Sequence, residues 1–269
     1  MNYQKVTDYL ACRLKDYLQG TNLKGFVIGV SGGVDSAVVS TLCAMTGLPT
    51  TVVSMPIHQA PDQVSRAMEH ILWLMKRFPN VFKEEIDLTQ TFEVFKASIP
   101  PQNQTELLLA NARARLRMTA LYSFGMLVTG TGNRIEDFGV AFFTKYGDGG
   151  VDISPIGDLL KTQIFKVAEY LGIILSIRKA IPTDGLWGDN RSDEDQLGAK
   201  YPELEWAMGF CEESGLKTPQ EIGTVTNFIT DRQKEVLNIY LTWHNAGKHK
   251  MNMPSIFVIP EEYKMDDIS

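Results

Sequence analysis

The residues best suited to chemistry form a glycine-rich loop, Ser31-Gly32-Gly33-Val34-Asp35-Ser36. The loop directly follows an apolar run at residues 25–30 and directly precedes a pattern typical of a helix. A strand that turns through two glycines into a helix leaves backbone N–H groups and the positive end of the helix directed at one point, which suits a phosphate group. We therefore expect this loop to bind an anion.

The loop lacks the lysine of the Walker sequence G-x-x-x-x-G-K-[ST], whose ammonium group reaches the outer phosphates of a nucleotide. It offers instead the hydroxyls of Ser31 and Ser36 and the carboxylate of Asp35. Carboxylate and phosphate oxygens together are a usual ligand set for Mg²⁺. The positive charge that a bound nucleotide requires must therefore come from another part of the chain.

Length and composition describe an ordinary globular protein. The chain has 269 residues, of which 44% are hydrophobic and 22% charged, and no long linker divides it, so we expect a single domain over residues 1–269. The formal net charge of −6 argues against a general nucleic-acid-binding protein, since that affinity depends on clustered Lys and Arg. No apolar run approaches membrane-spanning length. Three widely separated cysteines indicate neither a zinc site nor a disulfide framework, which fits the cytoplasm.

Short apolar runs alternate with amphipathic patterns along the chain, which is typical of a Rossmann-like α/β fold with a parallel sheet and helices on both faces. Strands are expected at residues 25–30, 50–55, 81–86 and 127–130, and helices at residues 1–20, 34–45, 62–78, 103–124 and 218–245. We expect Asn103 and Glu106 to form a capping box, and Thr218 to cap the last helix. Ligands of such sheets bind at the carboxyl ends of strands, where the loop at Ser31 lies.

The expected helix at residues 103–124 carries one asparagine and three arginines. Helical spacing puts Asn111 and Arg115 on a face with apolar residues, and Arg113 and Arg117 on the opposite face. An arginine on an apolar face must be paired or must bind an anion. Spacing alone therefore leaves a structural salt bridge and an anion contact open for Arg115.

The sequence Ser-Gly-Gly-x-Asp-Ser resembles the pyrophosphate-binding loop of the N-type ATP pyrophosphatases, which split ATP between its α and β phosphates to adenylate an acceptor. Within that class the chain resembles the NAD synthetases in several ordered motifs between Gly29 and Lys250. The matching stretches are residues 111–118, 130–136, 143–152, 152–162, 182–198 and 248–250. The run from Phe143 to Asp152 is the most specific, since its density of glycine, lysine and aspartate has no simple packing explanation.

The resemblance implies a role for each matching residue. The implied ATP contacts are Gly29, Val30, Ser31, Gly32, Gly33, Val34, Asp35, Ser36, Thr131, Lys161 and Thr183. The implied contacts of nicotinic acid adenine dinucleotide are Arg115, Lys145, Asp152, His249 and Lys250. Lys161 would supply the positive charge that the loop lacks. Between Thr131 and Lys145 the chain is one residue longer than the commonest family spacing, so Glu136 or Asp137 could bind Mg²⁺ with Asp35, and we favour Glu136.

The resemblance further implies an ammonia-dependent ligase that converts nicotinic acid adenine dinucleotide to NAD through an acyl-adenylate, releasing AMP and pyrophosphate. Asp35 and Lys161 are then the expected catalytic residues, with Asp152 as a group that could select or deprotonate ammonium. A homodimer is also implied. Only about thirty residues precede the loop, too few for a fused glutaminase domain, so ammonia itself is the expected nitrogen source, while a separate glutaminase chain stays open.

Two other classes of protein share part of this pattern. A GMP-forming or tRNA-thiolating enzyme would use the same adenylation step, but a thiolating enzyme is expected to carry paired cysteines and a basic surface. A nucleotide-binding sensor would need the glycine loop but not Lys145, Asp152 and the pair His249-Lys250. These residues therefore separate a synthetase from a sensor.

Overall fold

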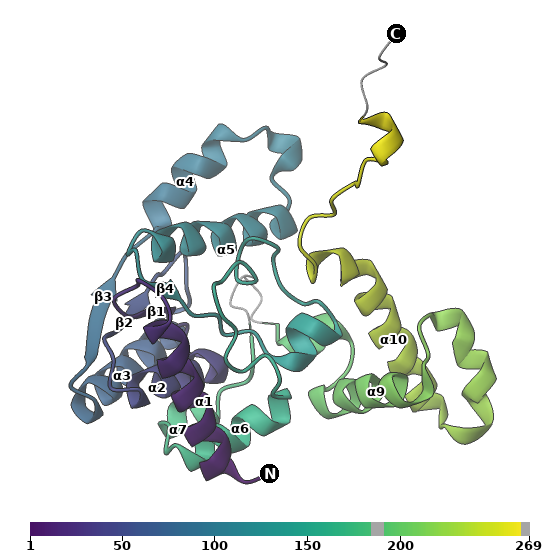
Figure 1. Cartoon of the computed structure of the whole chain (residues 1–269), viewed down its shortest axis with the longest axis horizontal. Helices are drawn as coiled ribbons and strands as arrows, with labels where there is room; N and C mark the ends of the chain where they lie inside the picture. Colours follow the sequence, from purple (N-terminus) through teal and green to yellow (C-terminus); the bar gives the residue numbers. More distant parts are fainter. Residues whose placement is uncertain (184–190, 265–269) are drawn as a thin grey trace.

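A computed structural model describes residues 1–183 and 191–264, apart from the side chains of residues 226–228. Within these ranges a parallel sheet runs in the order β3-β2-β1-β4 (Figure 1). The strands are β1 (Phe26–Gly29), β2 (Thr50–Ser54), β3 (Val81–Glu85) and β4 (Leu127–Val128). The order reverses between β1 and β4, and such a switch point is where α/β sheets bind their ligands.

Helices cover both faces of the sheet, which confirms the predicted Rossmann-like fold. Because side chains alternate along a strand, Phe26 and Ile28 pack on one face and Val27 on the other. The first face is covered by α1 (Tyr3–Gln19), α2 (Val34–Met45), α3 (Pro61–Arg77), α6 (Lys161–Tyr170) and α7 (Leu175–Arg178). The second face is covered by α4 (Thr89–Ser98) and α5 (Glu106–Tyr122). In the part of the chain that the structure describes, no helix has the length and apolar character needed to cross a membrane.

The start of α5 differs from the prediction. Thr105 caps the helix, because its hydroxyl accepts the backbone N–H of Leu108. The predicted Asn103 cap is wrong, since Asn103 ends a separate 3₁₀ turn, η1 (Pro101–Asn103). Proline at the first position of η1 fixes the backbone there and sets this turn apart from α5.

The helix predicted at residues 218–245 is two elements, the 3₁₀ segment η3 (Pro219–Phe228) and the helix α10 (Asp231–Gly247). Thr230 separates them, because its hydroxyl accepts the Gln233 N–H while the Gln233 side chain accepts the Thr230 N–H. The helix α10 packs on α9 (Tyr201–Ser214) in a second hydrophobic cluster. Ile135, in the π-helical turn η2 (Arg134–Gly139) that follows β4, belongs to this cluster and connects it to the sheet.

His70 is a titratable group buried in the core. It lies on α3, completely buried, with its Nε2 atom 3.0 Å from the hydroxyl of Ser40 and its ring stacked on Trp73. Burial disfavours the charged imidazolium and lowers the pKa of His70 to about 4. The folded protein therefore resists protonation at this position.

We expect His70 to reduce stability in mild acid. Because its folded-state pKa lies below the ordinary value of 6.5, the unfolded chain binds the proton first, so stability is lost as the pH falls from about 6.5 towards 4. His70→Gln should reduce the difference in free energy of unfolding between pH 7 and pH 5 by about 2 kcal/mol. Urea denaturation of both proteins at both pH values measures this, and an undiminished difference in the variant would contradict it.

Gly32, in the glycine loop, is held against α3. Its φ of +85° is left-handed, and a Cβ atom there would lie 2.6 Å from the carbonyl oxygen of Gln63. Gly47 also has a left-handed φ, +74°, but nothing lies within 4 Å of its Cβ position. The two glycines therefore differ in steric contact and not in backbone conformation.

Gly32→Ala should destabilise the protein more than Gly47→Ala. Both variants carry a left-handed alanine, which costs about 1 kcal/mol, and only the first also collides with α3, which adds about 2 kcal/mol. Urea denaturation of the two variants gives the comparison. Equal losses would mean that the loop moves away from α3 without cost.

Candidate active site

The glycine loop, at the carboxyl end of β1, is stabilised by hydrogen bonds of its own serine hydroxyls. The Ser36 hydroxyl accepts the Ser31 N–H at 3.2 Å and donates to the Gly33 carbonyl at 3.0 Å, while the Ser31 hydroxyl accepts the Gly33 N–H at 3.2 Å. The helix α2 begins at Val34 with no side-chain cap on its first turn. The first N–H groups of α2 therefore face the loop and are suited to an anion.

Next to the loop, Lys161 lies between two carboxylates. Its Nζ atom is 2.6 Å from Asp35 Oδ2, on α2, and 2.8 Å from Glu136 Oε1, on η2. The amide of Asn133 bridges the other oxygens of both acids, at 3.1 Å to Asp35 and 2.6 Å to Glu136. Lys161 is the first residue of α6, and only 3% of it is exposed.

The charges of this cluster are coupled. Burial alone would lower the pKa of Lys161, but the charges and hydrogen bonds of Asp35 and Glu136 raise it above the ordinary lysine value. The ammonium is therefore charged. Burial raises the pKa of Asp35 above its ordinary value, against the opposing effect of the Lys161 charge. The described residues contain no group of three His, Cys, Asp or Glu side chains that could hold a metal ion. Asp35 and Glu136 nevertheless fit Mg²⁺, which usually takes one or two carboxylates plus phosphate oxygens.

The geometry favours Glu136 over Asp137 as the partner of Asp35. Glu136 faces Lys161, whereas the carboxylate of Asp137 packs against Gly132 so closely that a Cβ atom there would overlap it. Burial and the charges of nearby carboxylates raise the pKa of Asp137 well above its ordinary value. Burial also raises the pKa of Asp35, so the distinction between the two candidates rests on geometry, since Glu136 and Asp35 share the Lys161 ammonium.

Tyr201 is a site residue that the sequence analysis missed. It lies on α9, 3% exposed, and its hydroxyl donates to Glu136 Oε1 and lies 3.3 Å from Asp193 Oδ2. Burial and the Glu136 charge raise its pKa above the ordinary tyrosine value, so the hydroxyl remains a donor. Asp193 begins the helix α8 (Asp193–Leu197), whose first turn is acidic and is capped by Ser192. No motif marks Tyr201, because only the packing of α9 brings it here.

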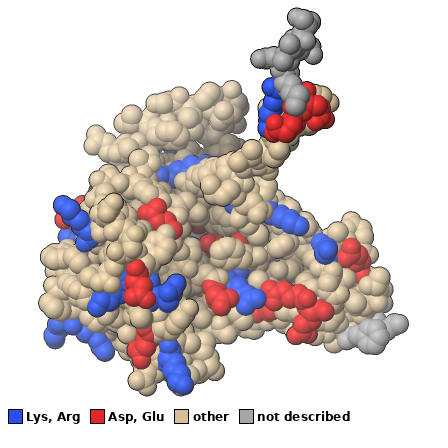
Figure 2. All heavy atoms as spheres, in the orientation of Figure 1, with Lys and Arg blue, Asp and Glu red and all other residues tan. Residues whose placement is uncertain are grey.

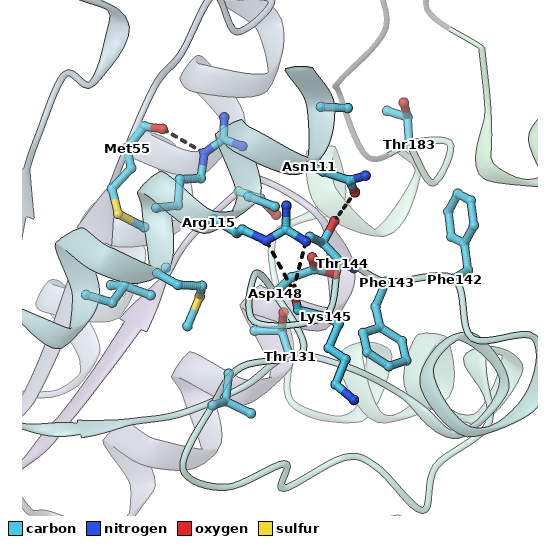
Figure 3. A pocket seen from close by; sticks show the side chains of 18 of the residues that line it. Met55, Asn111, Arg115, Thr131, Phe142, Phe143, Thr144, Lys145, Asp148 and Thr183 are labelled. Atoms are coloured by element: carbon cyan, nitrogen blue, oxygen red, sulfur yellow. Dashed lines mark hydrogen bonds between the residues drawn. The ribbon is translucent and has the colours of Figure 1, made fainter. Parts of the chain in front are cut away.

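A cavity of about 830 Å³ opens between the loop, α5, residues 141–148 and the end of α10 (Figure 3). The predicted residues that line it are Gly29, Val30, Ser31, Arg115, Thr131, Lys145, Thr183, His249 and Lys250. Asp35, Glu136 and Lys161 are not among its lining residues. The structure therefore brings most predicted ligand contacts to one cavity, whose lining does not include the charged cluster.

The predicted dinucleotide contacts are joined to one another through backbone carbonyls. Lys145 donates to the carbonyls of His249 and Asn252, both at 2.9 Å, and Arg115 donates twice to the carbonyl of Lys145 at 3.2 Å (Figure 3). Lys250 in turn donates to the carbonyl of Phe143 at 2.8 Å. These cations thus attach the end of the chain to the loop that follows η2.

The position of the Arg117 side chain, on α5, differs from the prediction. It was placed opposite Arg115, yet both line the cavity. The long side chain of Arg117 reaches from α5 to the end of β2, where it donates to the carbonyl of Met55 at 3.0 Å and to the amide oxygen of Gln59 at 2.8 Å. Helical spacing locates the Cα atom but not the end of so long a side chain.

The surroundings of two further predicted site residues, Asp152 and Thr183, are as follows. Asp152 does not line the cavity: its carboxylate accepts the Val128 N–H at 2.8 Å and the Tyr122 hydroxyl at 3.1 Å, so its action on ammonia stays a prediction. Thr183 lines the cavity, and its hydroxyl donates to the Arg191 carbonyl at 3.0 Å. The predicted family segment Gly185-Leu186-Trp187 lies outside the described residues.

The fold and site together define a class of protein. A lysine-free glycine loop stands at the switch point of a parallel sheet, and a buried lysine with two carboxylates stands beside it. This is the arrangement of a nucleotide-binding α/β enzyme of the ATP pyrophosphatase type.

Comparisons with known proteins identify the family. A family model described as NAD synthase matches residues 6–254. An NH(3)-dependent NAD(+) synthetase of Sulfurisphaera tokodaii is 30% identical over 96% of this chain and 90% of its own length, and one of Mesoplasma florum is 38% identical over 76% and 84%. The structure of an NMN synthetase from Francisella tularensis is 31% identical, with a TM-score of 0.80 over 96% of this chain and all of that one. An NH3-dependent NAD synthetase from Campylobacter jejuni shares the fold, with a TM-score of 0.74 at 23% identity over 96% of this chain and all of that one. The chain belongs to the NAD synthase family and is a ligase that forms carbon–nitrogen bonds.

Lys161→Met should destabilise the protein by about 3 kcal/mol, because it leaves two buried carboxylates without their cation. Adding Glu136→Gln to this variant should recover a large part of the loss, since one of the two uncompensated charges is removed. Urea denaturation measures both effects. Lys166→Met, an exposed position on the same helix, is the matched control and should leave stability nearly unchanged. A double variant no more stable than Lys161→Met would contradict the electrostatic explanation.

Proposed function

We propose that this ligase amidates nicotinic acid adenine dinucleotide with ammonia and ATP, giving NAD, AMP and pyrophosphate. The observation that carries the proposal is Lys161, buried between Asp35 and Glu136 beside a phosphate-binding loop that has no lysine of its own. The names of the relatives at 30% to 38% identity support the same substrates. The proposal includes Mg²⁺ as the metal ion and a homodimer as the active form.

The proposed chemistry is adenylation followed by amide formation. A carboxylate is a poor electrophile, because its charge is delocalised and its leaving group would be oxide. In the first step a nicotinate oxygen attacks the α-phosphorus of ATP, the bond to the bridging oxygen breaks, and pyrophosphate leaves. In the second step ammonia attacks the acyl carbon, AMP leaves with the bonding electrons, and the amide nitrogen loses its extra proton to solvent. Positioning and electrostatics then supply the catalysis.

The described residues have defined parts in this scheme. The N–H groups at the start of α2 and the hydroxyls of Ser31 and Ser36 would bind the departing pyrophosphate. The ammonium of Lys161 would donate hydrogen bonds to the same phosphates, stabilising negative charge as it develops. Asp35 and Glu136 would hold Mg²⁺, which would offset phosphate charge, and Asn133 and Tyr201 would fix the orientation of their carboxylates.

A second candidate function is amidation of nicotinic acid mononucleotide. It is favoured by the likeness to the NMN synthetase from Francisella tularensis, which has the highest TM-score of the compared structures described above. Both reactions transform the same nicotinate carboxylate and differ in whether the acceptor carries an adenylyl half. Arg117, Gln59 and the rest of the cavity wall at the end of β2 do not by themselves separate the two substrates.

The test mixes the purified protein with ATP, Mg²⁺, ammonium and one of the two nicotinate nucleotides, and identifies every product. We expect NAD and AMP in equal amounts, with kcat/KM for the dinucleotide at least about tenfold above that for the mononucleotide, a ratio that corresponds to about 1.4 kcal/mol of transition-state binding. A reversed ratio would establish the second candidate function. Release of ADP and orthophosphate would overturn both, and Lys166→Met serves as the control for a Lys161→Met variant that should lose turnover.

A further inference from the structure

The glycine loop carries no cation of its own. The chain has a formal net charge of −6, and acidic and basic side chains are interspersed on the face that Figure 2 shows. Long-range attraction therefore contributes little to the binding of an anionic nucleotide. In the proposed function, the part that the loop itself plays in binding phosphate depends on how firmly its backbone N–H groups are held in one geometry.

A buried histidine close to the glycine loop has polar atoms that core packing does not require. His70, on α3, is completely buried, and its Nε2 atom lies 3.0 Å from the hydroxyl of Ser40, on α2. Within the part of the chain that the structure describes, the buried Nδ1 atom of His70 has no hydrogen-bond partner. A buried polar atom without a partner destabilises a protein, whereas an apolar side chain of similar shape would not. The presence of a histidine here therefore needs an explanation other than stability.

The hydrogen bonds of Ser40 identify the protonated nitrogen of His70. The Ser40 hydroxyl donates its hydrogen to the carbonyl of Ser36 at 2.7 Å, so its oxygen is left to accept from the His70 ring. A hydrogen bond between the ring and the carbonyl of Ala37, which can only accept, agrees with this direction. The opposite tautomer would leave a buried Nδ1–H group without an acceptor. We therefore assign the neutral Nε2–H form to His70.

The hydrogen bonds continue from Ser40 into the glycine loop. Ser36, whose carbonyl accepts from Ser40, is also the residue whose hydroxyl organises the loop. That hydroxyl accepts the Ser31 N–H at 3.2 Å and donates to the Gly33 carbonyl at 3.0 Å. His70, Ser40 and Ser36 thus form a continuous hydrogen-bond chain from α3 to the backbone of the loop.

Helix α3 also contacts the loop at a second point. A Cβ atom on Gly32 would lie 2.6 Å from the carbonyl oxygen of Gln63 and 3.1 Å from the backbone nitrogen of Ala67, so the loop packs directly on the backbone of α3. The His70 ring is in turn stacked on Trp73, with ring centroids 5.5 Å apart, which fixes the direction of its donor. Helix α3 is therefore in contact both with the turn of the loop and, through His70, with α2.

We propose that His70 is a positioning residue for the phosphate-binding loop and acts through Ser40 and Ser36. This inference rests on the proposed function and adds a residue to it. The His70 donor fixes α2 against α3 next to the loop, and so keeps the N–H groups at the start of α2 directed at one point. Groups that are already ordered bind an anion without the entropic cost of ordering them. His70 does not line the cavity, so its effect on a bound phosphate is indirect.

A purely structural role for His70 leads to different expectations. Packing beside Trp73 requires a side chain of suitable size but no hydrogen-bond donor. Leucine at position 70 would fill much of the same space and would remove the unpartnered nitrogen. A structural role therefore places the effect of this substitution in protein stability, whereas the proposed role places it in the affinity for the outer phosphates of the nucleotide.

Isothermal titration calorimetry with pyrophosphate and with AMP, each in the presence of Mg²⁺, tests the proposal on the full chain. His70→Leu should raise the dissociation constant of pyrophosphate about fivefold, as expected for the loss of one buried hydrogen bond. It should leave the dissociation constant of AMP unchanged, because AMP lacks the outer phosphates. His70→Gln should keep the pyrophosphate affinity within about twofold of wild type, since its amide can donate in place of the imidazole N–H. Thermal unfolding checks that each variant folds.

Substitutions on α2 test the hydrogen-bond chain itself. Ser40→Ala should weaken pyrophosphate binding as much as His70→Leu does, and the double variant should be no weaker than either, because both remove the same connection. Thr41→Val is the matched control. Thr41 is also buried on α2, and its hydroxyl donates within that helix, to the carbonyl of Ala37 at 2.7 Å. This variant should leave both dissociation constants unchanged.

Several results would overturn the positioning role. They are wild-type affinity for pyrophosphate in His70→Leu, a His70→Gln variant as weak as His70→Leu, equal losses for pyrophosphate and AMP, and additive losses in the double variant. Amide formation by the wild type, measured on the same preparation, separates this proposal from the proposed function. An active enzyme whose His70→Leu variant binds pyrophosphate normally would refute the positioning role alone. A wild type that forms no amide would refute the proposed function, and the calorimetry would still decide the role of His70.

Discussion

One buried ammonium group organises the active site. Lys161 is almost completely buried. Its two carboxylate partners come from other elements of the chain, and Asp35 is separated from it by 126 positions. A charge in such a place is tolerated only when paired and hydrogen-bonded, since desolvation costs several kcal/mol for each ion. The segments α2, η2 and α6 must therefore meet in one arrangement, or the charge is left uncompensated. In the proposed function, the same interaction that constrains the fold would also supply the cation that the glycine loop lacks.

The cluster is suited to change when a nucleotide binds. Lys161 pairs with both Asp35 and Glu136, but a bound phosphate would offer it another acceptor, and the two carboxylates would then be available to a divalent cation. Asn133 holds the other oxygens of both carboxylates, and the Tyr201 hydroxyl donates to the same Glu136 oxygen as Lys161, so the acids need not move when their partner is exchanged. Preorganised groups of this kind lower a barrier without reorganisation during the reaction.

Much of the fold could be predicted from local pattern, whereas the site depended on contacts between distant segments. The helix α2 has the predicted bounds, Val34–Met45, because its apolar period and the glycines before it are local signals. The burial of Lys161 and the part of Tyr201 could not be read from spacing, since each depends on the packing of α6 and α9 against η2. Arg117 shows the same limit at the scale of one side chain, because its length and not its helical position brings it to the cavity.

A lysine near the cavity can attach the end of the chain and still bind a ligand, because its ammonium group has several N–H donors. An ammonium group has three N–H donors, and Lys145 uses two of them on the carbonyls of His249 and Asn252. One donor then remains for a ligand, so attachment of the chain end and recognition of a substrate do not exclude each other. Burial lowers the pKa of Lys250, although its donors are held by carbonyls. A ligand phosphate near these two lysines would add the negative charge that their carbonyl partners lack, and would thereby strengthen the attachment of the chain end.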